Sequence, residues 1–310
     1  MGIKNTVFPS KSERENYYKL SRTWGTDYRI YHNLPFLHVF TTDNLVDYSF
    51  PNNPIEITDK NIALLKKTSI DFSICDSNDT PLLCIEFDGL KDGFNVGTTY
   101  HPKEPLFSPW RKIITELKLR VAHGSIFPYF VVGSKHFNDT SDQIKLTIVD
   151  GIIGEVITFI KSNDKFSEGF NPLEIGYSED EFNNLSPDIK HDMIQDWVFM
   201  IEIEMEFENN PIIKKVSELT QKYGISSYKK ERLEYPTPNF SINMKDRINQ
   251  FSNALMFGSK VTLYSKIYGE SVGQIWLPNF KSPGYSGFGL LDEIAKLIAL
   301  ENLRRNNNLD

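Results

Sequence analysis

Three acidic residues lie inside two short apolar stretches, IDFSIC (70–75) and PLLCIEFDG (81–89). They are Asp71, Glu86 and Asp88. Apolar and β-branched residues dominate β-strands, so a carboxylate within a strand needs solvent, an ionic partner or a metal ion. Mg²⁺ prefers carboxylate oxygens and often binds one or two of them together with a substrate phosphate. These residue types are therefore typical of metal-assisted chemistry on a phosphate ester.

The two stretches are predicted to pair as an antiparallel hairpin, because the intervening DSNDTP is rich in turn-forming residues. Strand alternation puts the three acids on one face and the apolar residues on the other. We predict a register that pairs Cys75 with Cys84, which would place Asp71 opposite Asp88 and bring all three acids onto one patch. A solvated face, or pairing with Arg and Lys from a helix, explains the same spacing equally well.

A basic helix is predicted to follow the hairpin, over SPWRKIITELKLRVAHG (108–124). Ser108 and Pro109 suit its first positions, and apolar residues recur at helical spacing up to Gly124. Arg111 and Lys118 are seven residues apart, so they share a stripe beside the apolar face. Lys118 could therefore reach the acidic patch, although a lysine that extends its head group to solvent fits the same position.

The remaining elements of the first half give the order helix, strand, hairpin, helix, strand. A first helix is predicted from a capping box of Ser12 and Glu15 up to Gly25. The other predictions are an extended or edge strand at 28–40, a short helix at 59–69, a loop at 89–105 and a buried strand at 128–134.

This order and these residues resemble the PD-(D/E)XK nuclease superfamily, whose restriction-endonuclease-like core is helix, three strands, helix and strand. The resemblance rests on Asp71, on the strand Ile85-Glu86-Phe87-Asp88-Gly89 and on Lys118 in ELKLRVAHGSIFPYFVV, and it covers roughly residues 10–135. It implies an α/β fold with a mixed central sheet flanked by helices. Glu116-Leu117-Lys118 also spells E-x-K, but two positions apart on a helix point about 200° apart, so these residues are not the motif.

The resemblance also implies roles for particular residues. Asp71 and Glu86 correspond to the two metal-binding acids, with Mg²⁺ or Mn²⁺ as the cofactor. Asp88 occupies the position of the usual motif lysine, and the branch of the superfamily with an Ile-Glu-x-Asp-Gly strand places that lysine on the next helix, at Lys118. Asp88 would then be a further metal ligand or a partner of Lys118. A first-helix glutamate of such families would fall on Glu13 or Glu15, and the capping box accounts equally well for Glu15.

Residues 136–310 are expected to form a largely C-terminal α+β elaboration. Within them, 152–161 favours a helix, 165–187 a polar loop, 188–208 an acidic helix whose second half could be a strand, 260–280 a hairpin at Gly269 and 290–303 a helix. The region could elaborate the same domain, recognise substrate, or bind a second copy or a partner protein.

Composition and charge limit the classes of function that the protein could have. The 310-residue chain has a formal net charge of −7, which argues against coating nucleic acid through bulk charge. Residues 101–136 nevertheless carry six basic against two acidic side chains, and Arg111, Lys112 and Arg120 are the candidate nucleic-acid contacts. Two cysteines, no signal-peptide pattern and no long apolar run favour a cytoplasmic protein without a membrane partner.

Two functions remain in view. One is a metal-dependent nuclease acting on nucleic acid, DNA in preference to RNA. The other is a nuclease-fold binding or assembly subunit that no longer cleaves, which the acid at position 88 favours. No nucleophile elbow, P-loop or dinucleotide-binding motif supports a different chemistry.

Overall fold

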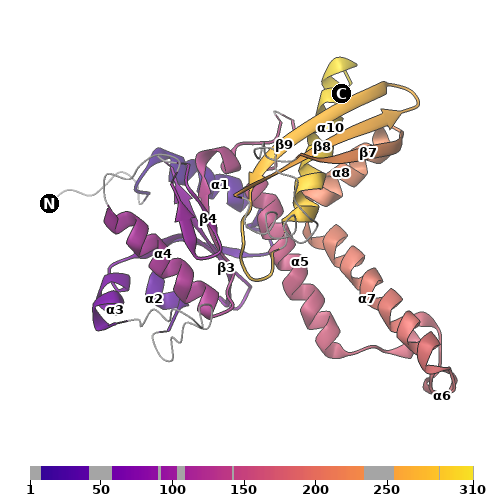
Figure 1. Ribbon diagram of the computed structural model, residues 1–310, viewed down its shortest axis with the longest axis horizontal. Helices are drawn as coiled ribbons and strands as arrows, with labels where there is room; N and C mark the ends of the chain where they lie inside the picture. Colours follow the sequence, from indigo (N-terminus) through magenta and orange to yellow (C-terminus); the bar gives the residue numbers. More distant parts are fainter. Residues whose placement is uncertain are drawn as a thin grey trace, which may run out of the picture.

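The computed structural model of the protein shows a mixed α/β architecture with helices on both faces of a central sheet (Figure 1). The structure describes residues 8–41, 58–89, 92–102, 109–141, 143–233, 255–285 and 287–309. The predicted mixed sheet flanked by helices is therefore confirmed.

Four strands form the central sheet, in the order β1-β2-β3-β6. Their bounds are Arg29–Pro35 for β1, Ser69–Cys75 for β2, Pro81–Asp88 for β3 and Tyr129–Gly133 for β6. The first two pairings are antiparallel and β3 pairs with β6 in parallel. The parallel pairing requires a crossover, and the helix α4 (Pro109–Gly124) supplies it.

The two faces of this sheet are covered by different helices. Phe72, Ile85 and Phe130 are fully buried in one core cluster with residues of α1 (Lys11–Trp24) and α5 (Ile148–Glu168). The opposite face packs against α4 and the short helices α2 (Phe36–Val39) and α3 (Asp59–Leu65). The predicted division of the hairpin into an apolar and an acid-bearing face is confirmed, because the acids lie on the α4 side.

The edge of β6 is closed by side chains from other segments. Val131 N donates to Asn95 Oδ1 at 2.7 Å, from the small hairpin of β4 (Phe94–Val96) and β5 (Thr99–His101). Tyr129 N donates to Ser282 Oγ at 2.9 Å. These contacts satisfy backbone groups that an edge strand otherwise exposes.

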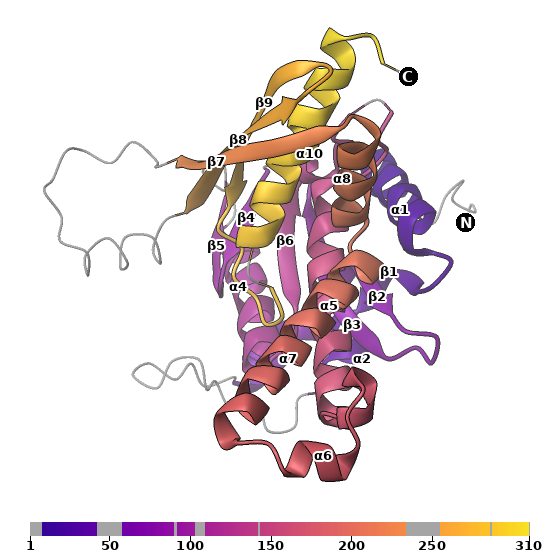
Figure 2. The same ribbon diagram turned by 90° about the vertical axis from the view of Figure 1, so that its right-hand side faces the viewer.

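The C-terminal half adds a helical arm and a second sheet. The arm consists of α5 and α7 (Pro187–Asn209), with the small helices η2 (Pro172–Ile175) and α6 (Glu179–Asn183) between them (Figure 2). An antiparallel sheet of β7 (Ile225–Leu233), β8 (Met256–Ser265) and β9 (Gly269–Pro278) packs on α10 (Phe288–Asn306), next to α8 (Pro211–Lys222).

The packing does not stop at residue 135. One cluster of buried residues joins Phe72 of the central sheet to Ile152 of α5, Ile212 of α8, Val261 of β8 and Leu290 of α10. The proposed division into 1–135 and 136–310 is thus a change in architecture within one continuous core.

Several local predictions are corrected. The first helix is capped by Ser10, whose Oγ accepts from Glu13 N at 3.1 Å, so the cap lies two residues before Ser12. The strand predicted for 28–40 ends at Pro35 and gives way to α2. The loop at 89–105 contains the β4–β5 hairpin, and the loop at 165–187 contains the end of α5 together with η2 and α6.

Other local predictions hold. The acidic stretch 188–208 is helical throughout, the hairpin at Gly269 is present, and both 152–161 and 290–303 are helical. The proposed cap Ser108 lies outside the described residues.

Candidate active site

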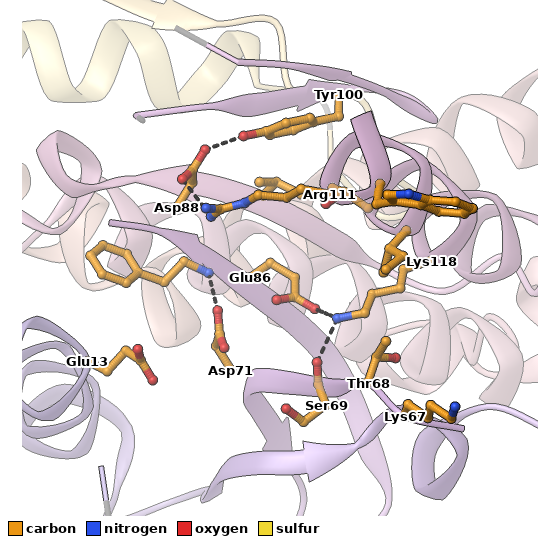
Figure 3. Close-up of a pocket in the computed structure, with 15 residues that line it drawn as sticks. Glu13, Lys67, Thr68, Ser69, Asp71, Glu86, Asp88, Tyr100, Arg111 and Lys118 are labelled. Atoms are coloured by element: carbon orange, nitrogen blue, oxygen red, sulfur yellow. Dashed lines mark hydrogen bonds and ion pairs between the residues drawn. The ribbon is translucent and has the colours of Figure 1, made fainter. Parts of the chain in front are cut away.

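A pocket of about 620 Å³ opens between the acid-bearing face of the sheet, α4 and the first helix (Figure 3). Its lining includes Glu13, Asp71, Glu86, Asp88, Arg111 and Lys118. The fold thus brings both acid-bearing strands and the predicted lysine to one place. Glu116 is absent from the lining and accepts from Tyr100 N at 3.2 Å, as expected if the helical E-x-K spacing is not a motif.

The hairpin register differs by two residues from the predicted one. Ser73 pairs with Cys84, whereas Cys75 pairs with Pro81 after an irregularity in the ladder. The physical reason lies in the turn, where Asp76 Oδ1 accepts from Asn78 N and Thr80 N, each at 2.8 Å, and shortens the connection. The shift moves Asp71 away from Asp88 and toward Glu86.

Asp71 and Glu86 are therefore the two acids that lie side by side. Asp71 Oδ2 accepts from Phe87 N at 2.8 Å, which fixes its carboxylate next to the strand that carries Glu86 (Figure 3). Burial, and then the charge of Glu86, raise the pKa of Asp71 to about 8. Asp71 is consequently largely protonated at neutral pH when no metal is bound.

Lys118 extends from α4 to the same two strands. Its Nζ forms an ion pair with Glu86 Oε1 and donates to the backbone oxygen of Ser69 at 2.6 Å. The residue is only 7% exposed, which excludes the alternative of a lysine that reaches solvent. A buried ammonium is costly unless it is paired, so Glu86 and Lys118 depend on each other.

Tyr129 is a site residue that sequence reasoning missed. Its hydroxyl donates to Glu86 Oε1 from the neighbouring strand β6. Burial and the charge of Glu86 raise the pKa of Tyr129 well above its ordinary value, so the phenol remains a donor. In the sequence, Tyr129 is only a tyrosine at the start of a predicted buried strand, and such a position predicts that the ring packs in the core.

Asp88 does not join the other two acids. Its carboxylate accepts from Arg111 Nη2 at 2.8 Å and from the Tyr100 hydroxyl (Figure 3). It also accepts from Gly93 N at 3.1 Å. In the described ranges, no three His, Cys, Asp or Glu side chains form a group that could hold a metal ion. The predicted cluster of three carboxylates is therefore wrong, because the register shift and Arg111 separate Asp88 from it.

Glu13, and not Glu15, is the first-helix glutamate at the pocket. Glu15 is on the exposed side of α1, where it pairs with Lys11 at 3.6 Å. Glu13 lines the pocket and its Oε2 is 3.1 Å from His32 Nε2. The expectation of a catalytic Glu15 is corrected, because two positions on a helix point about 200° apart and only Glu13 faces the pocket.

The candidate nucleic-acid contacts divide into two sets. Arg111 lines the pocket, and Lys112 is exposed beside it and lies 3.8 Å from Glu116. Arg120 is not among the lining residues, and its buried Nε has no hydrogen-bond partner in the described part of the chain. Lys67 and Trp110, which were not predicted, complete the basic and aromatic rim.

The donor set of the pair suits a hard divalent cation. Among the described residues, Asp71 Oδ1 and Glu86 Oε2 accept no hydrogen bond, and the other oxygen of each carboxylate is anchored. Two fixed carboxylates that repel each other are favourable ligands for Mg²⁺ or Mn²⁺, which complete their coordination with water and substrate oxygens.

We expect the metal-free protein to lose stability as pH rises between the ordinary Asp71 pKa of 3.8 and about 8, because the folded state then holds a proton that the unfolded chain releases. Asp71→Asn removes this loss and stabilises the metal-free protein at pH 8 by on the order of 1–3 kcal/mol. Urea denaturation with a chelator, at pH 6 and pH 8, measures the difference.

The control for this prediction is Glu15→Gln, which also removes one carboxylate but at an exposed position. Added Mn²⁺ should stabilise the native protein at pH 8 and leave Asp71→Asn unchanged. Identical pH dependence of the native protein and Asp71→Asn would contradict the raised pKa.

Comparison with protein-family models, curated proteins and solved structures finds no match to this chain. In the described part of the chain, no helix is both long enough and apolar enough to cross a membrane.

Proposed function

We propose that the protein is a metal-dependent nuclease of the restriction-endonuclease-like class that hydrolyses phosphodiester bonds. The observation that carries this proposal is the contact between Lys118 and Glu86 beside Asp71, inside a pocket open to solvent. Asp88 stands at the sequence position of the motif lysine, and Lys118, from the helix after the hairpin, would supply the ammonium group instead. The order of elements in the core supports the same class.

The chain supplies two carboxylates and one ammonium to the reaction. Asp71 and Glu86 would hold Mg²⁺ or Mn²⁺. When bound, such an ion polarises a phosphate and lowers the pKa of bound water. Lys118 Nζ, fixed by Ser69 and Glu86, provides a positive charge for the negative charge that develops on the phosphate oxygens. Tyr129 keeps the Glu86 carboxylate oriented.

Nucleic acid is the proposed substrate because basic and aromatic side chains surround the acidic centre. Arg111, Lys112 and Lys67 offer cationic contacts for phosphates, and the ring of Trp110 is 55% exposed beside them. DNA is favoured over RNA only by the resemblance of the core.

The competing function is a nuclease-fold subunit that binds nucleic acid without cleaving it. The observation in its favour is that Asp88 forms an ion pair with Arg111, so one acid and one candidate phosphate contact neutralise each other. Under this alternative the Glu86–Lys118 pair is a structural element of the pocket.

The test is incubation of the purified protein with single- and double-stranded DNA and RNA, with Mg²⁺, with Mn²⁺ or with chelator. The proposal expects cleavage only with metal, and products whose ends show hydrolysis of a phosphodiester. Binding of any of these substrates without cleavage in either metal would favour the competing function.

Trp110→Ala should weaken binding of single-stranded substrate by about five- to 150-fold, because base stacking on an aromatic ring contributes roughly 1–3 kcal/mol. Binding is measured by fluorescence anisotropy with Ca²⁺ in place of Mg²⁺. The matched control is Ile113→Ala, which removes an exposed apolar side chain from the same helix but not from the pocket. Equal effects of both substitutions would contradict a stacking role.

A further inference from the structure

A second pocket, of about 540 Å³, lies outside the candidate active site. It is bordered by α5, the C-terminal part of α7 and the loop that leads into α10, and Figures 1 and 2 show these segments beside one another. We call it the arm pocket. Its volume is in the range of small-molecule sites.

The arm pocket is acidic without a counter-charge in its lining. Glu155, Glu202 and Glu206 line it, and none of the lining residues is Lys, Arg or His. Glu155 is partly buried, and its carboxylate accepts from Leu290 N at 2.8 Å and Gly287 N at 3.3 Å, at the start of α10. Glu202 and Glu206 are exposed on α7. The pocket thus has one fixed carboxylate within it and two more on its α7 side.

Two buried polar atoms that border the arm pocket have no hydrogen-bond partner among the residues that the structure describes. They are Ser162 Oγ and Asn210 Nδ2, from side chains that are 5% and 1% exposed. Thr158, which also lines the pocket, is by contrast satisfied by the backbone oxygen of Met205. Native proteins rarely leave such atoms unsatisfied, so they indicate a bound group.

Aromatic rings form the remaining walls. Phe159, Phe166 and Tyr285 line the arm pocket, and Phe159 is 49% exposed although it lies next to the loop. Gly284 has φ +72, and a Cβ there would lie 2.8 Å from the Phe159 ring. The glycine therefore allows the loop to approach the ring. Ring faces attract cations, and they also cover aliphatic carbon.

We propose that the arm pocket binds an aliphatic diamine. One ammonium group pairs with Glu155, and the other pairs with Glu202 and Glu206 and donates to Ser162 Oγ. The alkyl chain between them lies on the aromatic rings. Asn210 Nδ2, an N–H donor, is satisfied by a water that the first ammonium shares. This inference does not depend on the proposed nuclease activity.

Binding should strengthen as pH rises. Burial raises the pKa of Glu155 to about 7, and the groups that face it are Glu206, Glu202 and Tyr285, none of which carries positive charge. An alkylammonium remains charged well above this pH. The diamine therefore meets an ionised Glu155 at pH 8 and a largely protonated one at pH 6.

The experiment is isothermal titration of the full chain with the diamine putrescine, and separately with butanediol and with Mg²⁺ alone. We expect putrescine to bind, more tightly at pH 8 than at pH 6, and butanediol not to bind. Glu206→Gln should weaken putrescine binding by roughly tenfold through the loss of one charged contact. Ser162→Ala should weaken it as well.

The matched control is Glu204→Gln, which makes the same charge change on α7 at an exposed position outside the arm pocket. It should leave the affinity within about twofold of native, because an exposed charge outside the site is largely screened. Thermal unfolding of each variant checks that the fold is retained. Absence of heat with putrescine, equal effects of Glu204→Gln and Glu206→Gln, or equally tight binding of Mg²⁺ with the same variant dependence would each overturn the proposal.

Discussion

Lys118→Met and Glu86→Gln should each lower the rate of metal-dependent cleavage by roughly 10²–10³-fold, as expected for loss of a fixed group that stabilises transition-state charge. Lys118 loses its charge in the first variant. In the second, Glu86 loses the carboxylate that pairs with Lys118 and would hold metal. Single-turnover cleavage at saturating protein measures the chemical step separately from binding.

The double variant should be little slower than either single variant, because the two side chains act as a unit. Lys66→Met and Glu15→Gln are the matched controls: they remove the same charges at exposed positions that do not line the pocket. Retained cleavage in Lys118→Met, with its fold intact, would remove the lysine from the mechanism. Equal losses in the control variants would show an effect of overall charge.

Trp24→Ala should lower the free energy of unfolding by about 3–5 kcal/mol, the usual cost of truncating a large buried aromatic side chain. Trp24 is 5% exposed, and its Nε1 donates to Asp150 Oδ1 at 2.9 Å, which joins α1 to the start of α5. Asp150 is 1% exposed and also accepts from Thr147 N at 2.7 Å. The substitution therefore leaves a cavity and removes one hydrogen bond from the buried carboxylate of Asp150.

Trp24→Phe separates the two contributions, since it keeps most of the buried apolar area and loses the hydrogen bond, at a cost of about 1–3 kcal/mol. Trp110→Ala is the matched control, because that ring is 55% exposed and its removal should change stability by no more than about 0.5 kcal/mol. Urea denaturation gives all three values. Similar values for Trp24→Ala and Trp110→Ala would contradict the role of Trp24 in the core.

The sequence predicts the order of elements in the first half well, because each element has a strong local signal. The amphipathic spacing in 108–124 and the acid–apolar alternation at 70–75 and 81–88 are examples. Both strands are present and the helix forms over Pro109–Gly124, but Trp110 and Ile113 of its predicted apolar face are exposed. Local sequence signals do not predict structure that depends on a contact between residues far apart in the chain. The short strands β4 and β5 contain three residues each and carry little pattern, yet they deliver Tyr100 to Asp88.

Three features of the candidate site depended on structural details that a sequence pattern does not contain. Asp76 shortened the turn and moved the hairpin register, so that Asp71 meets Glu86 instead of Asp88. Ser10 and Ser12 are both three residues before a glutamate, and only the three-dimensional entry of the chain into α1 selects Ser10. The contact of Tyr129 with Glu86 required the parallel pairing of β3 and β6, which no short stretch encodes.

The side chains that occupy the edge of β6 have a consequence for association. Because Asn95 Oδ1 and Ser282 Oγ accept from Val131 N and Tyr129 N, these two donors are not available to an incoming strand. Strand addition by a neighbouring molecule, the common route from an open sheet to aggregation or domain swapping, would first have to displace both contacts. The segment that carries Ser282 comes from the far end of the chain, so this protection against self-association exists only once synthesis of the chain has reached that segment.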